Sequence, residues 1–413
     1  MRRLLTLVAA FALIAAACGG DSDPTTTTAA PGTTDASGTT AATVAPTTAP
    51  PATEPPPEGT QAMADACAPG ETDGDLNLYN WAEYIPIDSL AVDAEVTDLV
   101  SKFEEEFGVE VVLTEYDSNE VMLAQIDAGV GYDVIVPSDY MVSIMKDAGL
   151  LIKLNQATIP NMANLAPEFT NLPYDPGNLF SAPYQWGTTG IGYKYDAVDD
   201  AEGVSWGVIF DPAMADVNTG FISLLDDERE TMGAALLYLG YSLNTTNEAE
   251  VDEAAALIKE TKDRLAAFTS SGYWDLLTAG ETLVAQGWNG DFLFAYDEAS
   301  TEDYDAYEDF GYAIPTEGAA AWVDTMAIPS TVEHPCTAQA FINFMLDAFN
   351  GAELTNYNYY ASPNAAATEF IWEEILEWDA IYPPDDVLER LEFFEDLGDF
   401  GNYYADAYSA AKS

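Results

Sequence analysis

The chain has 413 residues and a formal net charge of −59 at pH 7, because 71 acidic residues outnumber 12 basic ones. Its 48% of hydrophobic and 12% of aromatic residues suffice for a large buried core, which excludes disorder throughout, and its length allows about two or three domains. The charge disfavours nucleic acid and acidic membrane surfaces as partners and attracts cations. Most of the acids are interpreted as a solvated surface tuned to the medium.

Residues 1–18 have the pattern of a lipoprotein signal peptide. A basic start precedes the apolar stretch Leu4 to Ala17, which is too short to span a bilayer as a stable helix. The small residues directly before Cys18 resemble the lipobox of bacterial lipoproteins, in which that cysteine becomes the lipidated N-terminus. Ordinary secretion with cleavage near Ala17 is the alternative.

Residues 19–66 are rich in Thr, Ala and Pro and contain almost no large apolar residue. This composition cannot form a buried core, so it predicts a disordered, extended tether. Signal peptide and tether together predict an extracytoplasmic, membrane-anchored lipoprotein at the cell surface or in the periplasm. No later segment is long and apolar enough to cross a bilayer, so the expected membrane anchor is the lipid alone.

Two cysteines remain after Cys18. They are Cys67, just before the expected folded region, and Cys336. Because cysteines outside the cytoplasm usually pair, we expect a disulfide between them, with two unpaired thiols as the alternative.

The first part of the folded region alternates β-rich runs with amphipathic patterns. This βαβαβα order predicts a parallel, doubly wound lobe. Its expected elements are strands at 76–79, 109–113 and 132–136 and helices at 92–107, 118–128 and 140–148.

A second set of elements follows a turn-rich stretch, 161–184. The whole pattern predicts an α/β fold with two lobes and a ligand cleft between them, because such sheets bind ligands at the carboxyl ends of their strands. The expected elements are strands at 190–195, 221–225, 283–288, 310–314 and 323–328 and helices at 229–239, 248–268 and 337–349.

No enzyme machinery is evident in the sequence. The single histidine, His334, lies in a proline-flanked turn, and the motifs of nucleotide binding and metal catalysis are missing. The acidic run 303–309 lacks the Gly and Glu of a calcium loop and is interpreted as a solvated loop. We therefore expect no catalytic residue, no metal site and no cofactor. A carboxylate-pair glycosidase stays open as an alternative, although no particular pair is singled out.

Short segments that combine tryptophan with carboxylate, or supply carboxylates alone, are the main indication of function. A ring face attracts a cation and covers methylene groups, while a carboxylate neutralises an ammonium, so a pocket of both suits a slender organic polycation. The segments are Trp81-Ala82-Glu83-Tyr84, Asp227-Glu228-Arg229-Glu230, Trp288-Asn289-Gly290-Asp291 and Trp322-Val323-Asp324.

Each of these segments also has a structural interpretation. Asp227, followed three residues later by Glu230, is close to a capping box, and capping is compatible with a carboxylate that faces the cleft. A single tryptophan at a strand end belongs to a core more often than to a ligand site. Trp322 and Asp324, two residues apart, are expected on the same face of a strand.

Several motifs, in order, resemble the spermidine/putrescine-binding proteins of bacterial ABC importers, within the extracellular solute-binding proteins. The resemblance implies a two-lobed, type II periplasmic-binding-protein-like fold with a hinge, which closes on a polyamine and delivers it to a membrane permease. The motifs are 79–86, 132–140, 183–187, 225–230, 288–290, 315–318, 322–324 and 327–329.

The resemblance also implies the site residues and the lobes. Phe394 aligns with a glutamine of the spermidine-type pattern, and the acids present leave the ligand's length open between putrescine and spermidine. The first lobe is expected to comprise 67–186 plus 323–370 and the second 187–322 plus 371–413. The implied ligand-binding residues are Trp81, Glu83, Tyr84, Ser138, Tyr140, Asp227, Glu230, Trp288, Asp291, Trp322, Asp324 and Tyr360.

We therefore expect the binding component of an ABC importer, monomeric and without catalysis, whose partners are a polyamine, a permease and a lipid anchor. A sensor that reports polyamine to a membrane signalling protein is the first alternative. The glycosidase is the second.

Overall fold

The computed structural model describes residues 59–87, 96–201, 203–301 and 303–413. The expected signal peptide with Cys18, and the expected tether up to residue 58, lie outside the described residues. Among the helices that are described, none has the length and apolar character needed to cross a membrane.

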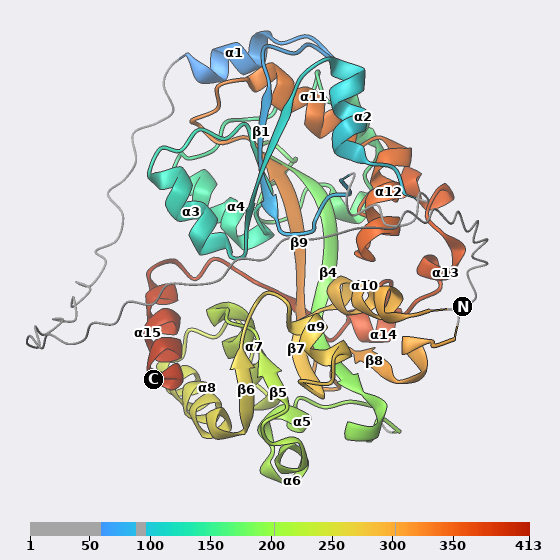
Figure 1. Cartoon of the computed structure of the whole chain (residues 1–413). Coiled ribbons are helices and arrows are strands. Elements are labelled where there is room, and N and C mark those ends of the chain that lie inside the picture. Colours follow the sequence, from blue (N-terminus) through green and yellow to red (C-terminus); the bar gives the residue numbers. More distant parts are fainter. Residues whose placement is uncertain (1–58, 88–95, 202, 302) are drawn as a thin grey trace, which may run out of the picture. The chain divides into compact units, whose positions relative to one another are not determined.

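One mixed sheet runs through the folded part of the chain (Figure 1). Its strands follow the order β2-β1-β3-β9-β4-β7-β5-β6, with β8 beside β4 and β10 beside β9. The strands are β1 (Leu76–Trp81), β2 (Val111–Tyr116), β3 (Val134–Ile135), β4 (Ser181–Lys194), β5 (Ile222–Leu224), β6 (Leu265–Phe268), β7 (Val284–Trp288), β8 (Phe310–Ala313), β9 (Ala319–Ala327) and β10 (Leu391–Phe393).

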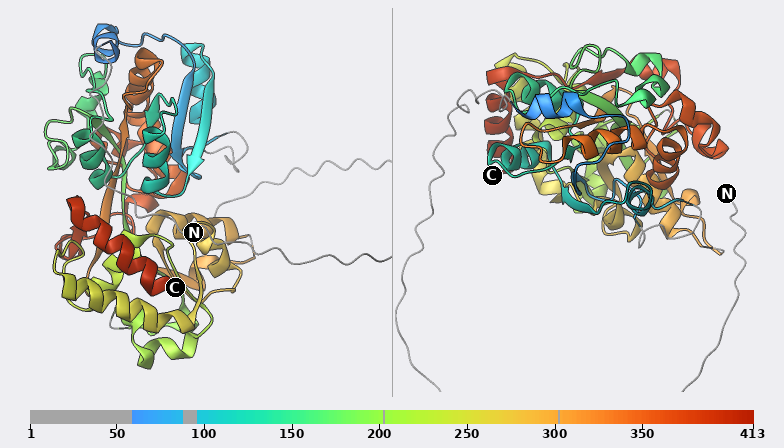
Figure 2. Two further views of the ribbon diagram at one scale, coloured as in Figure 1. Left: turned by 90° about the vertical axis from the view of Figure 1, so that its left-hand side faces the viewer. Right: turned by 90° about the horizontal axis from the view of Figure 1, so that it is seen from above.

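The helices form two groups, which the left view of Figure 2 separates. Lobe 1 denotes the elements around β1, β2 and β3, with helices α1 (Thr60–Ala66), α2 (Leu99–Phe107), α3 (Asn119–Asp127), α4 (Asp139–Asp147), α11 (Pro335–Met345) and α12 (Ala348–Asn358). Lobe 2 denotes the elements around β5, β6 and β7, with helices α5 (Gly207–Phe210), α6 (Pro212–Ala215), α7 (Glu228–Tyr238), α8 (Glu248–Thr261), α9 (Tyr273–Thr278), α10 (Asn289–Ala299) and α15 (Gly401–Lys412). The short helices α13 (Glu373–Leu376) and α14 (Asp385–Leu388) lie in the segment between α12 and β10.

Local sequence signals account for the first helices. The Asp98 side chain accepts a hydrogen bond from the Ser101 N–H at the start of α2, and Gly108, with φ of 70°, ends that helix. Ser118 caps α3 in the same way, by accepting from the Val121 N–H. Strand β1 pairs in parallel with both β2 and β3, which confirms the parallel arrangement predicted for lobe 1.

Strands β4 and β9 connect the two lobes. They pair antiparallel, with Gln185 opposite Asp324 and Gly187 opposite Trp322. Strand β9 also pairs with β3 of lobe 1, and β4 also pairs with β7 of lobe 2. The expected strands 190–195 and 323–328 cover only parts of this pair. The structure therefore places the strands of both lobes in one continuous sheet.

Three helices expected from periodicity are wrong at an end. The pattern 92–107 forms α2 only from Leu99, because Asp98 caps the helix there. The pattern 248–268 forms α8 only as far as Thr261, because Leu265–Phe268 pairs with β5 as an edge strand. The pattern 337–349 breaks before α12, where the Asp347 side chain accepts hydrogen bonds from the N–H groups of Phe349 and Asn350 and starts a new helix.

The end of the expected tether is also wrong, because residues 60–66 form α1. The Cys67–Cys336 disulfide joins this helix to α11, which confirms the predicted pairing. In addition, the buried Gln339 side chain donates a hydrogen bond of 3.0 Å to the Ala64 carbonyl. Fixed partners in lobe 1 therefore order a sequence that has little apolar surface of its own.

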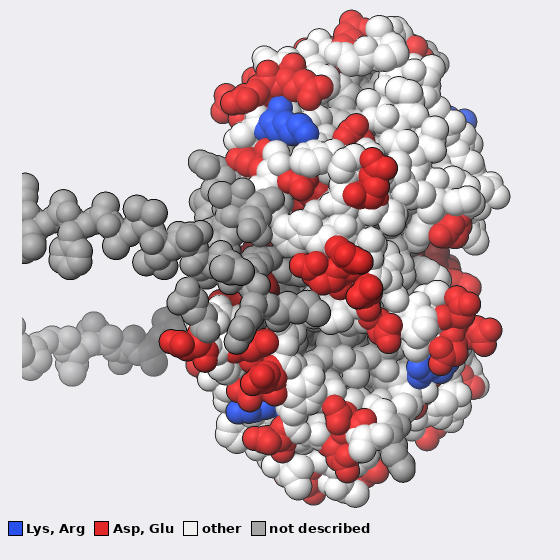
Figure 3. All heavy atoms as spheres, turned by 90° about the vertical axis from the view of Figure 1, so that its right-hand side faces the viewer, with Lys and Arg blue, Asp and Glu red and all other residues white. Residues whose placement is uncertain are grey.

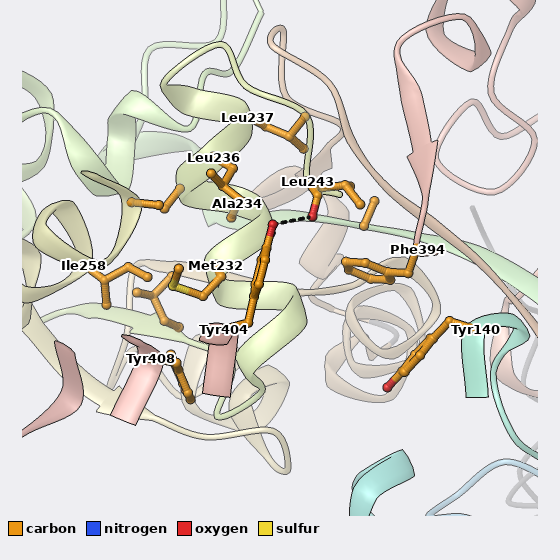
Figure 4. Close-up of a cluster of buried hydrophobic side chains, with 14 of the residues drawn as sticks. Tyr140, Met232, Ala234, Leu236, Leu237, Leu243, Ile258, Phe394, Tyr404 and Tyr408 are labelled. Atoms are coloured by element: carbon orange, nitrogen blue, oxygen red, sulfur yellow. Dashed lines mark hydrogen bonds between the residues drawn. The ribbon is translucent and has the colours of Figure 1, made fainter. Parts of the chain in front are cut away.

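The C-terminal helix α15 packs on α7 and α8 of lobe 2 (Figure 4). Tyr404 is fully buried there, and its hydroxyl donates to the carbonyl oxygens of Leu243 and Thr245. Tyr408 lies beside it, against the cluster that includes Met232. The end of the chain thus belongs to the core of lobe 2.

We predict that the double variant Cys67→Ala/Cys336→Ala is less stable than the wild type by about 2–4 kcal/mol, because the disulfide closes a long loop in the unfolded chain. Urea unfolding of both proteins measures the difference. The control is Met63→Ala, at an exposed position of α1, which should stay within about 0.5 kcal/mol of the wild type. Equal stability of the double variant and the wild type would contradict the prediction.

Candidate functional site

A cavity lies between lobe 1 and lobe 2, with β9 contributing to its wall. Residues from both lobes line it, and most of them follow the ends of strands. The lining residues are Trp81, Ala82, Tyr84, Tyr116, Asp117, Asn119, Ser138, Tyr140, Asp227, Arg229, Glu230, Ser270, Ser271, Trp274, Trp288, Asp291, Trp322, Asp324, Tyr360 and Phe394.

The structure brings together the residues that the sequence analysis assigned to a ligand site, with the exception of Glu83. Those that line the cavity are Trp81, Tyr84, Ser138, Tyr140, Asp227, Glu230, Trp288, Asp291, Trp322, Asp324 and Tyr360.

Glu83 does not line the cavity. It is exposed and has a left-handed backbone conformation, with φ of 55°, in the turn that separates Trp81 from Tyr84. Desolvation by the surrounding protein raises its pKa, and so do the carboxylates of Asp275 and Glu298 in lobe 2. Glu83 therefore belongs to an acidic group contributed by both lobes outside the cavity.

Asp324 is a buried carboxylate on β9. Its two oxygens accept hydrogen bonds from the Ser138 hydroxyl at 2.7 Å and from the Tyr84 hydroxyl at 2.8 Å. Burial raises the pKa of Asp324 to about 7, although these two donors act in the opposite direction. Neutral donors hold the carboxylate in place, and they do not neutralise its negative charge.

Glu230 is the second buried carboxylate. Its Oε1 accepts hydrogen bonds from the Trp288 indole N–H at 3.1 Å and from the Thr189 hydroxyl at 3.0 Å. Its Oε2 is buried without a hydrogen-bond partner among the described residues. Burial and the neighbouring Asp227 raise the pKa of Glu230 to about 8. Buried acceptors normally have a hydrogen-bond donor, so the donor for Oε2 would have to come from outside the described residues.

Asp227 caps α7, as the sequence analysis expected, because its Oδ1 accepts from the N–H groups of Arg229 and Glu230. Burial raises the pKa of Asp227. The Arg229 guanidinium lies over the rings of Tyr140 and Phe394, at 5.6 and 5.0 Å. It donates to the carbonyl of Glu395 and to the Asn244 side chain, so its hydrogen bonds lead away from the acids.

Asp291 lies in the first turn of α10 and accepts hydrogen bonds from two tyrosine hydroxyls. Its Oδ1 accepts from the Tyr360 hydroxyl at 2.5 Å, and its Oδ2 accepts from the Tyr273 hydroxyl at 2.6 Å. Burial raises the pKa of Asp291 to about 6. Tyr360 is fixed by a reciprocal pair of amides, since Gln185 and Asn358 donate to each other at 2.7 Å and Gln185 also donates to the Tyr360 carbonyl.

Aromatic rings complete the cavity wall. The rings of Trp81 and Trp288 lie 6.1 Å apart across the two lobes, and those of Trp322 and Tyr360 lie 5.2 Å apart. A Cβ atom on Gly187 would lie 2.7 Å from the Trp322 indole, so the glycine opposite leaves room for this ring. Trp322 and Asp324 both line the cavity, which agrees with the expected shared face of β9.

Sequence reasoning did not assign some of the lining residues. Ser270 and Ser271 follow β6, and the strand-end signal was lost there because 265–268 was expected to be helical. Asn119 had a signal as the start of α3, and its side chain donates to the Ser138 hydroxyl at 3.0 Å. The others not assigned are Ala82, Tyr116, Asp117, Arg229, Trp274 and Phe394.

The arrangement suits an elongated organic cation. Asp324 and Glu230 are at least nine-tenths buried, and neither forms an ion pair with a Lys or Arg among the described residues. Nor do the described residues include a group of His, Cys, Asp and Glu side chains that is placed to hold a metal ion. Ammonium groups would neutralise the carboxylates, and the rings would cover the methylenes between them.

Comparison with known proteins agrees with this geometry. The family model described as bacterial extracellular solute-binding protein matches residues 98–379. The chain is 38% identical over 325 residues to the putrescine/cadaverine-binding protein of Pseudomonas aeruginosa, covering 78% of this chain and 88% of that protein. It is 31% identical over 357 residues to the spermidine/putrescine-binding periplasmic protein of Escherichia coli, covering 86% and 96%. The crystal structure of the Tp0655 (TpPotD) lipoprotein of Treponema pallidum has a TM-score of 0.68 and 32% identity, covering 82% of this chain and 99% of that one.

The raised pKa of Asp324 predicts that Asp324→Asn stabilises the ligand-free protein near pH 8. The pKa is about 7 in the folded chain and about 3.9 in an unfolded one. The contribution of this carboxyl to folding stability is therefore fully present below about pH 4, and it is lost as the pH rises through about 7. Urea unfolding should show the variant about 1–3 kcal/mol more stable near pH 8, with a smaller difference near pH 5.

Asp175→Asn is the matched control for that experiment. Asp175 is also buried, but its carboxylate accepts hydrogen bonds from the N–H groups of Leu179, Phe180 and Ser181, which an amide nitrogen cannot replace. This variant should be less stable than the wild type at both pH values. The prediction is wrong if Asp324→Asn is likewise destabilised near pH 8.

Proposed function

The chain belongs to the family of bacterial extracellular solute-binding proteins, and from this membership we propose that it binds a polyamine in the cavity between its lobes. It is the binding component of an ABC importer and delivers the polyamine to a membrane permease. It carries out no catalysis of its own.

The observation that carries the proposal is a pair of buried carboxylates, neither of which forms an ion pair with a Lys or Arg among the described residues. Glu230 lies on α7 of lobe 2, and Asp324 lies on β9, which connects the two lobes. Both face a cavity walled by Trp81, Trp288 and Trp322. Burying an unpaired charge costs several kcal/mol, so such acids are retained where a ligand supplies the opposite charge. A sugar site would need neutral hydrogen-bonding groups in their place.

The named relatives support a polyamine over other cations. Both curated relatives bind putrescine according to their names, one together with cadaverine and the other with spermidine. They also support a binding protein over the carboxylate-pair glycosidase that the sequence alone left open.

The remaining parts of the proposal concern the anchor and the lobes. The chain is a monomeric, extracytoplasmic lipoprotein anchored to a membrane through Cys18, at the cell surface or in the periplasm, with 67–186 plus 323–370 and 187–322 plus 371–413 as its two moving bodies. Closure of these bodies on the polyamine would exclude water from the cavity and produce the form that a permease recognises. Acidic side chains occur over both lobes on the face shown in Figure 3, which would attract a cationic ligand.

A thermal-shift screen with putrescine, cadaverine, spermidine and spermine tests the proposal. At least one of them should raise the melting temperature, since a ligand at about 100 times its Kd stabilises the folded state by about 2.7 kcal/mol. The neutral control is 1,4-butanediol, which has the length of putrescine but no charge and should cause no shift. If none of the four amines stabilises the protein, the proposal fails.

Calorimetry with the best amine from that screen should show that Asp324→Asn weakens binding by at least about 30-fold, because a buried ammonium loses its partner. Glu253→Gln removes an exposed carboxylate of α8 and serves as the control for a change of one charge. Its affinity should stay within about twofold of the wild type at 0.15 M salt, where exposed charges are screened. Equal losses in both variants would point to bulk charge in place of this site.

A further inference from the structure

Tyr273, the first residue of α9, contacts two of the cavity residues through one oxygen atom. Its hydroxyl donates a hydrogen bond of 2.6 Å to Asp291 Oδ2 and accepts one of 2.9 Å from the Trp288 backbone N–H. Tyr273 is fully buried and does not itself line the cavity. It therefore acts on a ligand only through its neighbours.

The sequence provides space for this ring. A Cβ atom on Gly287, in the adjacent strand β7, would overlap the Tyr273 ring. The ring also lies edge-on to Trp288 and to Phe292, with centroids 6.1 and 5.2 Å away. Glycine in β7 thus leaves room for the Tyr273 ring of α9, whose hydroxyl is bonded to Trp288 and Asp291 at the start of α10.

Asp291 faces titratable groups from several elements. Tyr273 on α9 and Tyr360 after α12 donate to it, Tyr84 lies within electrostatic range, and Glu83 after β1 adds a second negative charge. Both hydrogen bonds lower the pKa of Asp291, while burial and Glu83 raise it. Tyr273 is therefore one of two groups that keep this carboxyl ionised near neutral pH.

We propose that Tyr273 is a positioning residue of the ligand site, which fixes the Trp288 ring and the Asp291 carboxylate as one unit of lobe 2. This inference rests on the proposed polyamine function, because it assigns to Asp291 the role of an ammonium partner and to Trp288 that of a ring wall. Tyr360 holds the other oxygen of Asp291, so the two phenols together define the direction in which the carboxylate points.

Removal of the Tyr273 hydroxyl should change the pH dependence of binding. The pKa of Asp291 is about 6, and without the Tyr273 donor it should rise above this value. Because only the ionised carboxylate neutralises an ammonium, the loss of affinity on acidification then begins at a higher pH.

The test compares Tyr273→Phe with Tyr296→Phe by calorimetry with putrescine between about pH 5.5 and pH 9. Tyr296 is the matched control, since it is fully buried in the same core and its hydroxyl donates to the Gly311 carbonyl, away from Asp291. Tyr273→Phe should bind about tenfold more weakly near pH 7 and recover most of this loss near pH 9. Tyr296→Phe should keep the wild-type pH profile.

A double-mutant cycle provides the second measurement. In an Asp291→Asn background, Tyr273→Phe should cause a clearly smaller loss than in the wild type, because the bond to the Asp291 carboxylate is already gone and only the bond from the Trp288 N–H remains to be lost. A wild-type pH profile for Tyr273→Phe, or the same loss in both phenylalanine variants, would overturn the proposal and leave Tyr273 with a packing role only.

The carboxyl titration of Asp291 in ligand-free protein, followed by carbon-13 NMR, separates this inference from the proposed function. Tyr273→Phe should move the midpoint to higher pH even if no polyamine binds to the wild type. An unchanged midpoint would refute the coupling of Tyr273 to Asp291, whereas absence of wild-type binding in the calorimetry would refute the polyamine function.

Discussion

The cleft depends on the antiparallel pairing of β4 with β9. These strands belong to neither lobe alone, since β9 continues the sheet from β3 and β4 continues it to β7. Every residue of β9 is buried, so the strand that carries Trp322 and Asp324 is held on both faces. One wall of the cavity is therefore built into the connection between the lobes.

Electrostatics make the buried acids of the cavity costly to the fold. Asp324 and Glu230 have pKa values raised to about 7 and 8, because burial penalises their ionised forms. Neutral donors such as Ser138 and Thr189 orient these acids without neutralising them. The stability given up in the cavity is offset by large apolar cores in both lobes, for example the Tyr404 cluster of α15.

Much of the fold and the site could be predicted from local patterns. Periodicity and caps located α3 and α4, and strand-end tryptophans located the cavity, because these signals are short-range. The sequence did not predict the ends of α8 and α11, since pairing of 265–268 with β5 and capping by Asp347 are decided by neighbours. Tyr273 was missed for the same reason, as its contacts with Asp291 and Trp288 cross three elements. Glu83 was placed with the cavity because a left-handed turn cannot be seen in spacing alone.

The position of α1 determines how mechanical load enters the described fold. Residue 59 leads directly into α1, and the Cys67–Cys336 bond ties that segment to α11 within lobe 1. Tension applied to the chain before α1 would thus reach a covalent link inside lobe 1 before it reaches β4 or β9, the strands that cross between the lobes.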